Sequence, residues 1–105
     1  MSIPTDENRE LLTVVATMRA LAGREADLKA LLESVVEPTR GEDGCVTYAL
    51  HQGVADPAVF VFYENWTSQA HLDKHLASPH ITSGLAGLPE LLDGELTITA
   101  LRRVA

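Results

Sequence analysis

The sequence predicts a single α+β domain whose strands and helices follow the order β-α-β-β-α-β. Four segments are rich in β-branched and aromatic residues and are expected to be strands. Two other segments repeat their apolar residues at helical spacing, one after the first strand and one after the third. The chain has 105 residues, a length that supports one hydrophobic core rather than two.

The first strand is expected over residues 11–19, LLTVVATMR. Its even-numbered residues, from Leu12 to Met18, are apolar and share one face. The other face, which carries Leu11 and Val15, is also mostly apolar. We therefore expect both faces of this strand to be covered.

The first helix is expected over residues 23–39, GREADLKALLESVVEPT. From Leu28 onward, apolar residues recur at i, i+3, i+4, i+7 and i+8, a stripe that would pack on a sheet. Pro38 should end or kink the helix, because proline has no N–H and its ring clashes with the preceding turn. Residues 40–44, RGEDG, are expected to form a turn.

The second and third strands are expected at residues 45–52, CVTYALHQ, and 58–66, AVFVFYENW. The connection between them contains Gly53 and the pair Asp56-Pro57, which are typical of turns. Two strands joined by so short a loop favour an antiparallel hairpin.

A second helix is expected to begin after Thr67 or Ser68, because either side chain can cap it. The helix should extend to about Ala77. Leu72 and Leu76 lie one turn apart and would face the interior.

A short further helix and the fourth strand complete the chain. The pair Ser78-Pro79 is typical of a helix start, since proline is favoured in the first turn, and Pro89 should stop this helix. Residues 95–103, ELTITALRR, alternate in the manner of a strand.

This order of elements is the split βαβ, or ferredoxin-like, arrangement: a four-stranded antiparallel sheet with its helices on one face. In a single chain the opposite face would meet water, yet the predicted strands carry apolar residues on both faces. A second sheet packed back to back would cover them. The sequence therefore predicts a homodimer that forms a dimeric α+β barrel.

Composition excludes several classes of function. The formal net charge is −7 and no run of Lys or Arg occurs, which disfavours nucleic acid or an anionic membrane as a partner. Cys45 is the single cysteine, so there is no disulfide framework and no thiolate metal cluster. Residues 1–10 are polar and acidic and are expected to form a disordered tail before one domain at residues 11–105. We expect a cytoplasmic protein, because that start lacks the apolar stretch of a signal peptide.

The segment from residue 66 to residue 80 holds the only tryptophan and three of the four histidines. His71 and His75 stand at i and i+4 on the second helix, a spacing that could bind zinc. No convincing third ligand accompanies them, so we predict no metal. His75 borders the apolar face of the helix, and His80 lies in the first turn of the next one.

Three stretches together resemble a known family: GCVTYAL at residues 44–50, FVFYENW at 60–66 and AHLDKHLASPHI at 70–81. They are similar to the antibiotic biosynthesis monooxygenase domains, particularly the small quinol monooxygenase branch. The resemblance implies a dimeric α+β barrel. It also implies that dioxygen oxidises a quinol or an anthrone-like phenol with no flavin, haem or metal, and therefore no cofactor.

The resemblance also assigns roles to residues. His75 matches the family's helix histidine, and Trp66 stands where the family places a functional tryptophan. A histidine suits the base that deprotonates a phenol, and an indole can stack on the ring while its N–H bonds an oxygen. Glu64 shares a strand face with aromatic residues and needs a partner if buried, most simply a histidine. We therefore predict that His75, oriented by Glu64, and Trp66 are catalytic.

Four further residues are expected to contact the substrate: Tyr48, Phe62, Leu72 and His80. For Tyr48, packing in the core is the alternative. Phe62 and Leu72 depart from the polyketide-tailoring members of the family, which tend to have asparagine and tyrosine at these positions. This departure puts the anthrone-oxygenase assignment in doubt.

Three classes of function stay open. The first is a cofactor-independent monooxygenase that acts on a quinol or a polycyclic phenol, with dioxygen as co-substrate. The second is a non-oxidative isomerase or cyclase, or an enzyme that processes a phosphorylated sugar. The third is a small-molecule-binding protein without turnover. A phosphate-handling site should hold Arg or Lys beside the histidines, where the sequence offers only Lys74 nearby.

Overall fold

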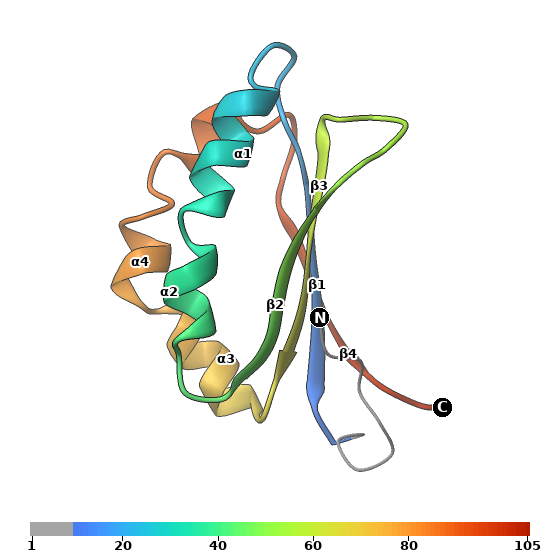
Figure 1. Cartoon of the computed structure of the whole chain (residues 1–105), viewed down its shortest axis with the longest axis vertical. Coiled ribbons are helices and arrows are strands. Elements are labelled where there is room, and N and C mark those ends of the chain that lie inside the picture. The colour runs from blue at the N-terminus through green and yellow to red at the C-terminus, as the bar shows by residue number, and fades with distance from the viewer. Residues whose placement is uncertain (1–9) are drawn as a thin grey trace.

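The computed structural model describes residues 10–105, and it confirms the predicted order of strands and helices (Figure 1). The tail predicted at residues 1–10 lies, apart from Glu10, outside the described residues. The elements, of which η2 is a 3-10 helix, are β1 (Leu12–Arg19), α1 (Glu25–Glu33), α2 (Val36–Arg40), β2 (Cys45–Gln52), β3 (Val59–Trp66), α3 (Gln69–Leu76), α4 (Pro79–Thr82), η2 (Leu88–Leu91) and β4 (Thr97–Arg102).

The four strands form one sheet in the order β2-β3-β1-β4, and all neighbouring strands are antiparallel. The helices cover one face of this sheet and leave the other bare (Figure 1). This is the ferredoxin-like fold that the sequence predicts. In the part of the chain that the structure describes, no helix is long and apolar enough to cross a membrane.

The core lies between the sheet and the helices. Alternate residues of β1 and β3 point into it, and Leu28 and Leu32 of α1 pack against them with no exposed surface. The buried residues of these two strands include Val14, Ala16, Met18, Phe60, Phe62 and Trp66. Each large side chain removed from water in this way contributes about 1.5–3 kcal/mol, so the periodicity that predicts the strands also stabilises the sheet.

The first helical segment is divided at Ser34 and Val35, between α1 and α2. Pro38 explains the break, because it has no N–H to donate to the Ser34 carbonyl four residues earlier and its ring would clash with that carbonyl. Pro38 itself lies inside α2, in the first turn, where a missing donor costs nothing. The interruption therefore precedes the proline. Pro89 likewise lies within the first turn of η2 rather than at the end of a helix.

The β2–β3 hairpin brings the turn before β2 next to the start of α3. Cys45 pairs with Trp66, so the residues that precede one strand lie beside those that follow the other. Gly44 sits in this turn with a φ of +82°, where a Cβ would overlap the ring of His71. This close approach fixes the turn against α3.

The face of the sheet without helices is partly apolar. Val15 pairs with Tyr63 across β1 and β3, and both are only partly buried. On the same face, Leu101 of β4 is 45% exposed. Asn65 is fully buried there, and its Oδ1 has no hydrogen-bond partner among the described residues. This surface is the one that the predicted homodimer would cover.

Candidate active site

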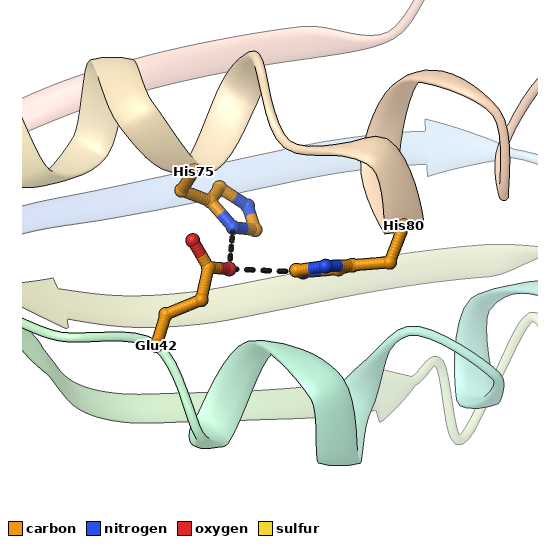
Figure 2. A group of neighbouring side chains, drawn as sticks. All are labelled: Glu42, His75 and His80. Atoms are coloured by element: carbon orange, nitrogen blue, oxygen red, sulfur yellow. Dashed lines mark hydrogen bonds and ion pairs between the residues drawn. The ribbon is translucent and has the colours of Figure 1, made fainter.

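Glu42 links two histidines that come from different helices (Figure 2). Its Oε2 accepts a hydrogen bond from His75 Nδ1 at 2.6 Å and lies 2.9 Å from His80 Nε2. The side chains are well shielded from water, with 15% of Glu42, 3% of His75 and 25% of His80 exposed. One carboxylate oxygen therefore positions both rings.

Helix caps place the two histidines. Ser68 caps α3, since its Oγ accepts a hydrogen bond from the backbone N–H of His71, and one turn later His75 faces the sheet. Ser78 ends that helix by donating from its Oγ to the His75 carbonyl at 2.6 Å. Pro79 then begins α4, which turns His80 back toward Glu42.

The bond to Glu42 decides the protonation of His75. A carboxylate only accepts hydrogen bonds, so Nδ1 carries the proton and Nε2 of the neutral ring has a free lone pair. Burial lowers the pKa of His75 from its ordinary value of 6.5, and it outweighs the bond to Glu42, which raises it. At neutral pH His75 is therefore uncharged, with Nε2 available as a base.

His75 lines a cavity of about 60 Å³ between the sheet and the helices. Besides His75, the lining side chains with polar groups are Tyr48 and Glu64. The rest of the wall is apolar and includes Met18, Leu32, Phe62, Ile81, Leu85 and Leu88. An apolar wall of this kind strengthens electrostatic interactions inside the cavity.

Glu64 is bonded to Trp66, not to a histidine. Trp66 Nε1 donates to Glu64 Oε1 at 2.9 Å, and both residues are almost completely buried, with Glu64 4% exposed. The prediction that Glu64 orients His75 is therefore wrong. The physical reason is that a buried indole N–H needs an acceptor, and Glu64, two residues away on the same strand face, supplies it.

The same hydrogen bond shows that, contrary to the prediction from the sequence, the Trp66 N–H is not directed at a substrate oxygen. Its N–H is occupied by Glu64, and its ring is fully buried, with its centroid 4.7 Å from that of His75. The two rings are in contact and leave no space for a substrate between them. Trp66 is therefore a packing partner behind His75 and Glu64, and it does not line the cavity.

The remaining predicted residues fall into two groups. Tyr48 and Phe62 line the cavity and stack with ring centroids 4.7 Å apart, and Tyr48 also meets the edge of His75 at 5.4 Å. Leu72 and His80 do not line it. Leu72 is buried in the core. His80 contacts Glu42 through its Nε2, which is also 3.2 Å from Thr39 Oγ1.

Sequence reasoning missed Glu42, which it placed in a turn. The signal was present: Glu42 and Asp43 are two carboxylates directly before β2. In an antiparallel hairpin, the start of the first strand lies beside the end of the second, and the histidine helix follows that end. The register of the hairpin therefore brings the acidic turn to the histidines.

The structure does not pair His71 with His75. His71 contacts Ser68 Oγ at 2.6 Å and Asp43 Oδ2 at 3.4 Å, away from Glu42. Donor atoms of Glu42, His75 and His80 do lie within 4.8 Å of one another, a set that meets the minimum for a metal ion. In the structure these groups are joined by hydrogen-bond distances, 2.6 Å from Glu42 to His75 and 2.9 Å from Glu42 to His80.

Residues 11–86 match the sequence model described as antibiotic biosynthesis monooxygenase. A Mycobacterium tuberculosis relative named "Putative monooxygenase Rv0793" is 36% identical over 90 residues, which are 86% of this chain and 88% of the relative. The structure of Rv0793 has a TM-score of 0.84 and 32% identity, and covers 90% of this chain and 96% of that one. The structure of PA3566 from Pseudomonas aeruginosa has a TM-score of 0.85 and 35% identity, and covers 90% and 95% of the two chains.

Proposed function

The chain belongs to the antibiotic biosynthesis monooxygenase family, and from this premise we propose that it oxidises a small quinol-type phenol with dioxygen and without a cofactor. The observation that carries the proposal is the position of His75. Its ring lines an apolar cavity while its Nδ1 is held by Glu42. This geometry presents a neutral base to a substrate in an apolar cavity.

The chemistry needs little more than such a site. A phenolate is electron-rich enough to reduce dioxygen itself, so the protein must supply a base, hydrogen-bond donors and a cavity that excludes water. His75 Nε2 would accept the phenolic proton. The imidazolium that forms would be stabilised by Glu42, whose carboxylate lies 2.6 Å from Nδ1. A carboxylate–histidine pair serves the same purpose in other base-dependent active sites.

The later steps follow from the phenolate. It gives an electron to dioxygen, and the resulting radical pair combines at a ring carbon to form a peroxide. Loss of the ring C–H proton and breakage of the O–O bond then yield a quinone and water. Tyr48 and Phe62 would pack on the substrate ring, because their stacked rings form part of the cavity wall. Trp66 and His80 would act indirectly, by packing against His75 and by bonding Glu42.

The size of the cavity narrows the substrate. It measures about 60 Å³, whereas an engineered apolar cavity that binds benzene measures about 150 Å³. A one-ring quinol could enter once residues at the rim, such as Leu76 and Ile98, move aside; these are 40% and 46% exposed. A polycyclic anthrone would need a much larger rearrangement. We therefore favour a monocyclic substrate.

Charge argues against the phosphorylated-sugar alternative. None of the described residues that line the cavity is Lys or Arg. Arg19 is paired with Asp56 at 2.6 Å and Arg24 with Asp27 at 2.8 Å. A buried phosphate would have no cation to balance it in this cavity.

We also propose that the bare face of the sheet packs on that of a second copy. Val15, Tyr63 and Leu101 make this face partly apolar. Burying such a patch stabilises a dimer. Light scattering measures the molecular mass in solution, and a mass equal to that of one chain would contradict this dimer.

The function is tested by oxygen uptake. Protein treated with a chelator would be mixed with monocyclic hydroquinones and, separately, with anthrones, and both dioxygen and quinone would be followed. We expect quinone formation from a monocyclic substrate, at a rate that chelation does not change. The absence of oxygen uptake with every substrate would contradict the proposed function.

A further inference from the structure

The carboxyl of Glu64 is only half used by the protein. Oε1 accepts the indole N–H of Trp66 at 2.9 Å, whereas Oε2 has no hydrogen-bond partner among the residues that the structure describes. The side chain is 4% exposed, and the surface it retains belongs to the wall of the cavity. Oε2 is not among the buried side-chain atoms that lack a partner, so it keeps accessible surface, and at this cavity wall a ligand can complete its hydrogen bonding.

The described groups that face Glu64 supply no Lys or Arg that would favour its charged form. Tyr48 and Cys45 face it from β2, Glu42 from the turn before β2, and His75 lines the same cavity from α3. No Lys or Arg lines the cavity among the described residues, so no such cation pairs with the Glu64 carboxylate there. Burial raises the pKa of Glu64 to about 7, the Trp66 bond lowers it, and the charge of Glu42 raises it further. The acid form is therefore well populated near neutral pH.

We propose that Glu64 is the general acid of the oxidation: its carboxylic acid gives a proton to the distal oxygen of the substrate peroxide as the O–O bond breaks. This assignment rests on the proposed monooxygenase function. It gives Glu64 a direct role in the reaction and leaves the positioning of His75 to Glu42. In this role the bond from Trp66 holds Oε1 and leaves Oε2 to carry the proton toward the cavity.

The step balances in atoms and electrons. After dioxygen has added to the ring carbon, His75 returns the phenolic proton to the peroxide and is again a neutral base. The intermediate is then a dienone hydroperoxide that still carries a C–H bond. His75 removes that proton, the C–H electron pair becomes the second bond of a new carbonyl, and the O–O bond breaks. The departing hydroxide takes the Glu64 proton and leaves as water. The proton on His75 then restores Glu64, so that one phenol and one dioxygen give one quinone and one water.

The other candidate donors fit this step less well. Burial raises the pKa of the Tyr48 hydroxyl far above its ordinary value of 10, so it holds its proton tightly. His80 lies outside the cavity lining and its Nε2 is engaged by Glu42. Glu64 combines access to the cavity with a proton that it can release near neutral pH.

The test uses Glu64→Gln, whose amide oxygen can still accept the Trp66 N–H but which cannot donate an acidic proton. Oxygen uptake, quinone and peroxide would be measured together with a hydroquinone that the wild type oxidises. The wild type should form one quinone for each dioxygen. The variant should still consume dioxygen but should accumulate peroxide, and quinone formation should fall by roughly 10²-fold, the usual share of a general acid.

Three results would overturn the assignment. Quinone formed by the variant at the wild-type rate would remove Glu64 from the reaction while leaving the proposed function intact. A wild type that consumes no dioxygen would remove both. Infrared spectroscopy supplies a measurement that needs no turnover: the wild type at about pH 6 should show the band of a buried protonated carboxyl that Glu64→Gln lacks. Identical spectra for the two proteins would show that the acid form is not populated.

Discussion

Glu64 and His75 line the same cavity, and burial reverses their ordinary order of acidity. The pKa of the Glu64 carboxyl is raised to about 7, while the pKa of the His75 imidazole falls below 6.5. An acid that keeps its proton and a base that lacks one can therefore coexist in one apolar site near neutral pH. Two titratable groups moved apart by their environments are a recurrent sign of acid–base catalysis.

This reversal predicts a narrow, bell-shaped pH profile for kcat/KM. Activity should fall as the pH drops through the pKa of His75, because the protonated ring is no longer a base. It should also fall as the pH rises through about 7, because Glu64 then loses its proton. Steady-state rates measured between about pH 5 and pH 9 test this. A profile that stays flat through pH 7 would contradict the role of Glu64.

Glu64 should also make folding stability depend on pH. Its pKa in the folded state lies above the ordinary value of 4.5, so its contribution is complete below that pH and is lost as the pH rises through about 7. The loss amounts to roughly 3 kcal/mol for a shift from 4.5 to about 7. The free energy of unfolding, measured in urea, should therefore decrease less between about pH 5 and pH 8 for Glu64→Gln than for the wild type. Equal decreases in the two proteins would show that the pKa of Glu64 is not raised by folding.

Glu42→Gln should weaken the base in a specific direction. The Glu42 carboxylate raises the pKa of His75, so its removal should lower that pKa and move the acidic limb of the profile to lower pH. The rate should fall by roughly 10- to 100-fold, since the imidazolium loses its counter-charge. Asp43→Asn is the matched control, because this neighbouring carboxylate contacts His71 instead. If the acidic limb of the pH profile is the same in Glu42→Gln as in the wild type, Glu42 does not set the pKa of His75.

Gly44→Ala should destabilise the turn that carries Glu42. Its φ of +82° is unfavourable for alanine, and the added Cβ would overlap the His71 ring. We expect a loss of about 1–3 kcal/mol of unfolding free energy. Gly41→Ala is the control: its φ is −82° and its nearest neighbour atom would be 3.6 Å away, an ordinary contact. Thermal unfolding of the two variants checks the difference, and equal midpoints would contradict it.

The sequence predicts the fold well because periodicity depends on local chain geometry. The apolar residues at helical spacing from Leu28 and the alternating apolar residues around Phe62 predict a helix and a strand that each bury one face. The β-α-β-β-α-β order of the elements then allows few topologies. The predicted position of the break between α1 and α2 was less accurate, because Pro38 disrupts the hydrogen bond to the carbonyl of Ser34, four residues earlier, and not the helix at its own position.

Partners inside the site were harder to predict. His75 was predicted because it borders the apolar face of its helix and matches the helix histidine of the family that the sequence resembles, but its carboxylate partner is 33 residues away in sequence. Only the register of the hairpin brings Glu42 there. For Glu64, its position on a strand face with aromatic residues indicated the need for a partner, but the histidine that was expected is not that partner. The partner is Trp66, two residues later, whose indole N–H donates a hydrogen bond to Glu64.

The central claim is that His75 is the base, and the rate of quinol-dependent oxygen uptake tests it most directly. His75→Ala and His75→Gln would be compared with His71→Ala, which removes the other histidine of the same helix, after circular dichroism shows that all three are folded. Both His75 variants should lose roughly 10²-fold or more of the wild-type rate at neutral pH, and His71→Ala should keep it. Folded His75 variants that turn over as fast as His71→Ala would contradict the account.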